Sequence, residues 1–210
     1  MNDTFDVIVI GGGPVGENAA QYAIAGTDLT CALVESHLVG GECSYYACMP
    51  SKALLHPLDV AAASADLRGL TPAGVEPSEL LARREAWVSH YDDTGQVRWA
   101  EGAGIEVVRG LGHITGERVV RVGDRTLTAR HAVVVATGSV AVIPEPLQAL
   151  LPWTSRDATG VREVPGSIAI IGGGVVACEA ARWLAALGSR VTMLVRRGLL
   201  SGLEPFAGEL

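Results

Sequence analysis

The 210-residue sequence lacks the features that would direct it to a membrane or to a nucleic acid. Its most apolar stretch, Ser167–Cys178, is shorter than the ~18 residues of a membrane span and contains three glycines. Lysine and arginine number 16 against 23 aspartates and glutamates, which gives a net charge of −7 without a basic block to contact phosphates. We therefore expect no membrane partner and no nucleic-acid partner.

Aromatic residues are also scarce, at 5%, but hydrophobic residues make up 49% of the chain, enough for a sizeable core. The length allows one large domain or two small ones. The first residues carry Asp3 and Asp6 where a signal peptide needs basic residues, so the sequence predicts a cytoplasmic protein.

An internal repeat organises the chain. In each copy a short apolar run is followed by a glycine turn, a segment with helical spacing, a glycine stop and a second apolar run, as in a βαβ unit. The first copy begins with the strand 6–10 and places Val15, Ala19 and Ala23 on one helix face. The second begins with Ser167–Ile171, and corresponding positions differ by 161 (172 − 11 and 196 − 35). The repeat predicts two buried parallel sheets of the α/β class.

The first glycine turn reads Gly11-x-Gly13-x-x-Gly16, which after a strand and before a helix is typical of a dinucleotide site. Gly11 permits a tight turn, Gly13 lets the backbone approach a pyrophosphate, and Gly16 allows close packing of helix on strand. Glu35, 24 residues after Gly11, ends the second strand, where an acid can bind ribose hydroxyls. The alternative is a turn that merely tolerates glycine.

The second turn, Gly172-x-Gly174-x-x-Ala177, has Arg196 at the position that corresponds to Glu35, followed by Arg197. A guanidinium matches a 2′-phosphate, so we expect a second, phosphorylated dinucleotide. The alternative is a solvated pair of charges.

Cys43 and Cys48 are five residues apart. In a straight helix their Cα atoms would be ~8.6 Å apart, whereas a disulfide needs less than ~7 Å. A bridge therefore requires a bent backbone, and Pro50 removes the N–H that would bond to the Tyr46 carbonyl. Such a bridge suits redox chemistry, and two buried thiols are the alternative. Cys31 and Cys178 are expected to be core thiols.

Between the copies, we expect a helix over 53–65 and another that starts at Ser78 and aligns Leu80, Trp87 and Tyr91. The pieces IEVVRG, GHITG, RVVRVGD and TLTARHAVVVATG predict a small antiparallel meander that leads into a buried strand at Ala132–Ala136.

Lys52 lies one helical turn after Cys48, and Glu179 follows the second turn; both could also be plain surface charges. A proline-rich stretch places the domain boundary near Leu150.

Taken together, these motifs resemble the pyridine nucleotide-disulfide oxidoreductases of the glutathione reductase, dihydrolipoamide dehydrogenase and mercuric reductase group. The resemblance rests on GGGPVG with Glu35, on the Gly40–Lys52 segment, on ATGS and on IGGGVVACE with VRR. It implies two Rossmann-like domains with parallel sheets and a small meander: an FAD domain over 1–150 and part of an NAD(P)H domain over 151–210.

The resemblance also implies a cofactor for each site. The FAD site would comprise Gly11, Gly13, Pro14, Gly16, Glu35, Gly41, Glu42, Lys52, Gly112, His113, Ala136, Thr137, Gly138 and Ser139. The NADPH site would comprise Gly172, Gly174, Ala177, Arg196 and Arg197. No metal site is expected.

By the same resemblance, Cys48 would face the flavin, Cys43 would exchange with a substrate disulfide or another acceptor, and Lys52 and Glu179 would pair near the flavin. The implied enzyme passes electrons from NADPH through FAD to the Cys43–Cys48 disulfide, and full-length relatives would be homodimers. The sequence is shorter than such relatives, which implies an N-terminal portion with an incomplete second domain. The alternative function is a cofactor-binding fragment without turnover.

Overall fold

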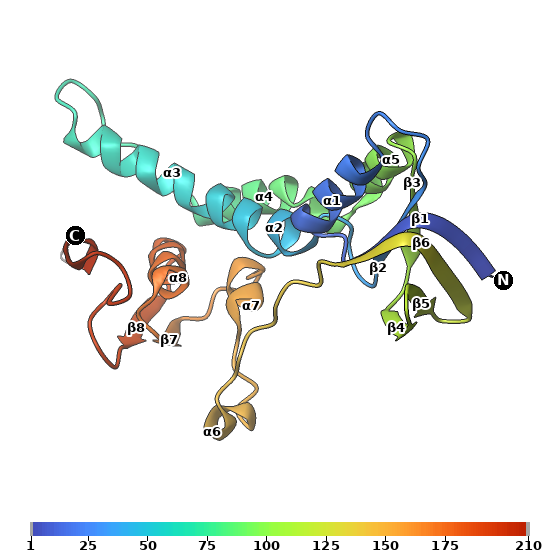
Figure 1. Cartoon of the computed structure of the whole chain (residues 1–210). Helices are drawn as coiled ribbons and strands as arrows, with labels where there is room; N and C mark the ends of the chain where they lie inside the picture. The colour runs from blue at the N-terminus through green and yellow to red at the C-terminus, as the bar shows by residue number, and fades with distance from the viewer. Residues whose placement is uncertain (1, 209–210) are drawn as a thin grey trace. The chain divides into compact units, whose positions relative to one another are not determined.

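A computed structural model describes residues 2–208, which form two compact units. The first unit comprises Met1–Tyr45 and Ser89–Val140, and the second comprises Tyr46–Val88 and Ala141–Leu210. Figure 1 follows the chain from its blue N-terminus to its red C-terminus. Among the described residues, no helix is both long enough and apolar enough to cross a bilayer.

The first unit contains a six-stranded mixed sheet and its helices. Its elements are β1 (Asn2–Ile10), α1 (Pro14–Ile24), β2 (Cys31–Glu35), α2 (Gly41–Tyr45), η1 (Ser89–Tyr91), α5 (Thr94–Gly102), β3 (Ile105–Arg109), β4 (Gly112–Gly116), β5 (Val119–Val122) and β6 (Arg125–Val135). The strand order is β3-β2-β1-β6-β5-β4. The first four strands in this order pair in parallel, and β6, β5 and β4 pair antiparallel.

Strand β1 is buried on both faces, as its continuous apolar run predicts. Val7 and Val9 join a core cluster with residues of α1 and α5, while Ile8 and Ile10 join a cluster with residues of β5 and β6. Alternate side chains of one strand thus fill two separate core layers. The alternation explains why the strand shows no polar positions at its carboxyl end.

Three details of the first unit differ from the sequence prediction. The segment Ala132–Ala136 continues β6 but is not buried, since Ala132 is exposed and Val135 is 60% exposed. The piece IEVVRG is not part of the meander but strand β3, which pairs in parallel with β2. Helix α5 returns the chain to the start of the sheet, so β3 runs in the same direction as β2 and pairs with it in parallel. Helix α1 buries Gly16, Ala20 and Ile24, and Val15 is 71% exposed, so the buried face lies one residue later than predicted. The absence of a side chain at Gly16 lets this face approach the sheet.

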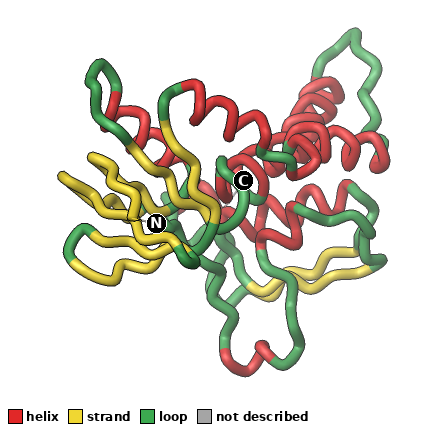
Figure 2. The backbone as a smooth tube through the Cα atoms, turned by 90° about the vertical axis from the view of Figure 1, so that its right-hand side faces the viewer, coloured by secondary structure: helices red, strands yellow, loops and turns green. Residues whose placement is uncertain are grey.

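The second unit combines helices with a two-stranded sheet. Its elements are α3 (Cys48–Asp66), α4 (Pro77–Trp87), α6 (Glu145–Gln148), α7 (Ser155–Thr159), β7 (Ser167–Ile171), α8 (Val175–Ala186), β8 (Arg190–Leu194) and η2 (Pro205–Gly208). Strands β7 and β8 pair in parallel on either side of α8 in sequence, which is the predicted second βαβ unit. Alternate residues of both strands are exposed, so this sheet is not buried on both faces as the repeat predicted. Figure 2 shows these strands in yellow, with red helices beside them.

The core of the second unit lies between helices. Its buried residues include Leu54 of α3, Leu80 of α4, Ala158 of α7, and Trp183 and Leu184 of α8. Helices α3 and α4 therefore group with α8, although they lie before the predicted boundary in sequence. The assignment of 1–150 and 151–210 to separate cofactor domains stays a prediction.

Helix α4 corrects another expectation. Glu76, not Ser78, is its N-cap, and the carboxylate of Glu76 accepts from the Ser78 amide. Tyr91 falls outside the helix, in η1. The buried face carries Leu80 and Arg84, whereas Trp87 is 38% exposed. Arg84 can be buried because its guanidinium donates to two backbone carbonyls, which the sequence pattern could not show.

Candidate functional site

The carboxyl ends of three parallel strands bring the first set of predicted residues together. Ile10 of β1 pairs with Val34 of β2 and with Val135 of β6, so the segments that follow these strands meet at one edge of the sheet. The Gly11 amide donates to the Val34 carbonyl at 2.8 Å, and the Ala136 amide donates to the Ile10 carbonyl at 2.8 Å. The glycine turn, Glu35 and the ATGS segment are therefore neighbours at the usual ligand-binding edge of such a sheet.

The glycines of the first turn are required by close backbone contacts. Gly11 has φ +104°, and a Cβ on it would lie 2.3 Å from the Ala136 carbonyl oxygen. A Cβ on Gly16 would lie 1.7 Å from the Gly11 carbonyl oxygen, which is the close approach of helix and strand predicted for the third glycine. Both contacts fix α1 with its N-terminus at the strand ends.

Gly13 leaves an open space at this N-terminus. It is the N-cap of α1, and a Cβ on it would meet only the Gly41 Cα, at 3.9 Å. Gly41 has φ +56°, and its own Cβ would lie 2.6 Å from the Gly13 Cα. The first amides of α1 have no acceptor within the helix, so this bare backbone surface suits a pyrophosphate.

Glu35 is held by the backbone around this site. Its Oε2 accepts from the Gly12 amide at 2.6 Å, and its Oε1 accepts from the His37 amide at 2.7 Å. Each carboxylate oxygen can accept a further hydrogen bond, so the side chain is oriented and can still bind a ribose hydroxyl.

The remaining predicted residues of the first unit surround the same edge. Gly112 of β4 packs closely against the ends of β1 and β2. A Cβ on it would lie 3.0 Å from Ile10 Cγ2 and 3.2 Å from Val34 Cγ1. Five others are exposed to solvent: Pro14, Glu42, His113, Thr137 and Ser139. Gly138, at φ +69°, turns the chain after β6.

The second glycine turn has similar geometry in the second unit. Gly174 is the N-cap of α8, with φ −82° and ψ 178°, close to the −78° and −179° of Gly13. Gly172 has φ +132°, and Ala177 leaves 3.8 Å between its Cβ and a Cβ on Gly172. Arg196 and Arg197 follow β8 and are exposed. The arrangement has the elements of a second phosphate site.

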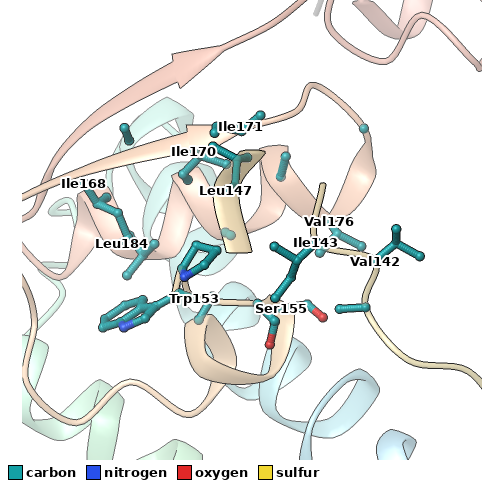
Figure 3. Close-up of a pocket in the computed structure, with 18 of the residues that line it drawn as sticks. Val142, Ile143, Leu147, Trp153, Ser155, Ile168, Ile170, Ile171, Val176 and Leu184 are labelled. Carbon is teal, nitrogen blue, oxygen red and sulfur yellow. The ribbon is translucent and has the colours of Figure 1, made fainter. Parts of the chain in front are cut away.

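An apolar pocket of about 920 Å³ borders this turn (Figure 3). Its wall includes Ile168 and Ile170 of β7, Val176 of α8, and Val142 and Ile143 of the preceding segment. The lining has two side-chain hydroxyl groups, those of Thr154 and Ser155. Among the described residues, no charged side chain lines the pocket. The pocket does not suit phosphate, and Arg196 and Arg197 lie outside its lining.

The cysteine segment is bent, as a bridge between Cys43 and Cys48 would require. Helix α2 ends at Tyr45 and α3 begins at Cys48, with Ala47 between them at φ −131° and ψ −91°. Cys43 is half-buried and Cys48 is exposed in the first turn of α3. Lys52 is exposed one turn later, and within residues 2–208 the structure records no ion pair between Lys52 and Glu179. Their pairing stays a prediction.

The other two cysteines differ in burial. Cys31 is 1% exposed, and burial raises the pKa of its thiol to about 11, as for a core thiol. Cys178 is half-buried, with its thiol 3.8 Å from the Gly173 carbonyl oxygen. Among the described residues, no group of three or more His, Cys, Asp or Glu side chains could hold a metal ion.

Two residues near the cysteine segment, Thr159 and Arg84, were not predicted from sequence. The carbonyl of Tyr46 accepts from the Thr159 hydroxyl at 2.8 Å, and Arg84 is fully buried against the end of α7. Arg84 lies four residues after Leu80, which could have placed it on the buried face of α4. For Thr159, the local sequence carries no corresponding signal.

The fold and the two glycine turns define an α/β protein with two dinucleotide-type βαβ units. The family model described as pyridine nucleotide-disulphide oxidoreductase matches residues 5–209, so the chain belongs to that family. This confirms the resemblance and the fold class that the sequence motifs indicated.

Relatives and solved structures agree with this assignment. The chain is 33% identical to a dihydrolipoyl dehydrogenase of Acholeplasma laidlawii, over 98% of this chain and 62% of that protein. It is 34% identical to a glutathione reductase of Burkholderia cepacia, over 91% of this chain and 43% of that protein. The Cu(II) complex of the HOCl-induced flavoprotein disulfide reductase RclA from Escherichia coli matches with a TM-score of 0.78 and 25% identity, over 97% of this chain and 45% of that one. The chain thus spans about half the length of these proteins.

Proposed function

We propose that the chain binds FAD at the first unit and NADPH at the second, and that it passes electrons to a Cys43–Cys48 disulfide and on to a disulfide or related acceptor. The observation that carries the proposal is the bare backbone surface of Gly13 and Gly41 at the N-terminus of α1, beside the oriented carboxylate of Glu35. When bound, a flavin links the two-electron chemistry of a nicotinamide to that of a disulfide.

The residues of the first unit fit a dinucleotide. The α1 amides would bind the pyrophosphate, Glu35 would accept from the ribose hydroxyls, and the ATGS segment after β6 would cover the cofactor. The glutathione reductase and dihydrolipoyl dehydrogenase names of two relatives support disulfide chemistry in this family. Within this chain, Cys48 is the proposed partner of the flavin and Cys43 the proposed partner of the substrate.

The proposal of NADPH rests on the two arginines after β8. Glu35 follows the corresponding strand of the first unit, whereas Arg196 and Arg197 offer guanidinium groups to a 2′-phosphate. A homodimer and a cytoplasmic location remain part of the proposal for the whole protein.

A reciprocal pair of substitutions tests both sites. Gly13 and Gly174 are N-caps with matching negative φ, and alanine meets open space at Gly174 and only the Gly41 Cα at Gly13. Neither change should disturb folding, but each puts a methyl group where a pyrophosphate must approach. We expect Gly13→Ala to weaken FAD binding at least about tenfold, or ~1.4 kcal/mol, and Gly174→Ala to weaken only NADPH binding.

The measurements are calorimetric titrations of the chain with FAD and with NADPH, and each variant serves as the control for the other. If the wild-type chain binds neither nucleotide, or if both variants bind both nucleotides like the wild type, the proposal is wrong.

A further inference from the structure

The backbone bend before Cys48 places the Tyr46 carbonyl between helices α2 and α3, just before Ala47, the N-cap of α3. Residue 50 would donate its amide to the Tyr46 carbonyl if the helix were regular, but it is proline and has no N–H. The next residue does bond in the helical pattern, from the Ser51 amide to the Ala47 carbonyl at 3.0 Å. The Tyr46 carbonyl therefore needs a donor from elsewhere in the fold.

Helix α7 supplies that donor. The hydroxyl of Thr159, a residue that is 3% exposed, donates to the Tyr46 carbonyl oxygen at 2.8 Å, the shorter of its two contacts, the other being the Arg156 carbonyl oxygen of α7 at 3.2 Å. One turn earlier on the same helix, the Arg156 guanidinium carbon lies 3.9 Å from the centre of the Tyr46 ring. The backbone and the side chain of Tyr46 are thus both held by α7.

The end of α7 is itself fixed from two other helices. Arg84 of α4 is fully buried and donates to the Thr159 carbonyl at 2.5 Å and to the Val161 carbonyl at 2.7 Å. The Trp183 indole of α8 donates to the Ala158 carbonyl at 3.1 Å. These bonds satisfy carbonyl groups that a helix end leaves open, and they hold the Thr159 hydroxyl in place.

We infer that Thr159 is a positioning residue of the Cys43–Cys48 pair and sets the equilibrium between its disulfide and dithiol forms. The inference rests on the proposed function. Closing the bridge requires the bent backbone, and the Thr159 bond holds the bend between the two cysteines before the S–S bond forms. Without the bond, closure must also order the segment, so the entropy cost of forming the disulfide rises.

The equilibrium can be measured without a flavin. Dithiothreitol reduces the bridge: one S–S bond of the protein breaks, its cysteines gain two electrons and two protons, and dithiothreitol becomes its cyclic disulfide. Wild type, Thr159→Val and Thr159→Ser are equilibrated with mixtures of reduced and oxidised dithiothreitol, trapped with acid and alkylated. Mass spectrometry then gives the fraction of the Cys43–Cys48 bridge.

We expect Thr159→Val to shift the exchange constant about tenfold toward the dithiol, which for two electrons is about 30 mV. Serine keeps the hydroxyl and should remain within about twofold of wild type. Thr159→Ala is a second variant that removes the hydroxyl without adding volume.

Thr154→Val is the matched control on the same helix. The Thr154 hydroxyl donates to the Asp157 carboxylate in the capping box at the start of α7, so its loss is expected to weaken the helix without removing the Thr159–Tyr46 hydrogen bond. An exchange constant for Thr159→Val and Thr159→Ala within twofold of wild type, or an equal shift in Thr154→Val, overturns the inference alone. Failure of the oxidised wild-type chain to form the bridge overturns the proposed function as well.

Discussion

The carbonyl oxygen of Gly11 occupies the space that a side chain on Gly16 would need, 1.7 Å from the position of its Cβ. Gly11 begins the turn after β1, and Gly16 is in the first turn of α1. The contact therefore joins strand and helix through backbone atoms alone, and it explains why the third glycine of the first turn is fixed by packing.

Gly16→Ala should consequently destabilise the first unit by about 3 kcal/mol or more, because neither backbone can move without separating α1 from the sheet. The second unit offers a matched control, since Ala177 already carries a Cβ at the corresponding position. Ala177→Gly should cost only about 1 kcal/mol through helix propensity. Urea unfolding followed by circular dichroism measures both, and equal effects of the two substitutions would contradict the packing role.

Arg196→Glu should reduce the preference for NADPH over NADH. The change removes a charge-assisted bond of ~1.5 to 3 kcal/mol to the 2′-phosphate, or roughly 10- to 150-fold in affinity. Arg190→Glu is the control, because Arg190 is another exposed arginine, at the opposite end of β8. The two affinities are measured by titration, and an unchanged ratio in Arg196→Glu would remove that residue from the proposed site.

Cys48→Ser should abolish the long-wavelength charge-transfer absorbance of a thiolate against bound FAD, whereas Cys43→Ser should retain or enhance it. The expectation follows from the proposed contact of Cys48 alone with the flavin. Spectra of the FAD-loaded variants, recorded anaerobically after reduction, check it. Cys31→Ser is the control for a thiol outside the site, since Cys31 is a buried core residue. Identical spectra for Cys43→Ser and Cys48→Ser would refute the assignment of roles.

Asp6 should make folding sensitive to acid. Hydrogen bonds from the Thr30 amide and hydroxyl, together with Arg130, lower the pKa of Asp6 from 3.8 to about 2. Between pH 4 and pH 2 the unfolded chain binds more protons than the folded chain, so this contribution is present above pH 4 and is lost toward pH 2. Asp6→Asn should lower the free energy of unfolding at pH 7, and it should make this free energy depend less on pH between pH 4 and pH 2. Urea midpoints from pH 2 to 5 give the test, and parallel curves for both proteins would contradict it.

The sequence predicts the elements whose residues satisfy a local rule. The strands β7 and β1, the glycine turns and the helix stops at Gly26 and Gly188 follow from apolar runs and from positive φ, which favours glycine. The prediction that strand β3 belongs to the antiparallel meander was wrong, because a short apolar run predicts a strand but not the strand with which it pairs. Its parallel register with β2 depends on α5, which returns the chain over the sheet.

The residues of the candidate site also differ in whether the local sequence predicts them. Local spacing identifies Gly11 and Gly16, and it shows that a bridge between Cys43 and Cys48 would need a bend. It does not identify Thr159, whose partner Tyr46 is 113 residues away, or the carbonyl partners of Arg84, which are 75 and 77 residues away. Contacts of this kind arise from the packing of helices on one another, which a single sequence does not reveal.

The central position of β1 in its sheet has a consequence for how the chain folds during its synthesis. Ile10 pairs with Val34 on one side and with Val135 on the other, so the second partner lies 135 − 10 = 125 residues further along the chain. A ribosome that has released β1, α1 and β2 must still synthesise everything through β6 before the strand gains its second neighbour. Long-range pairing of this kind slows folding and leaves apolar strand edges open meanwhile. We expect the nascent chain to depend on chaperones until residue 135 has emerged.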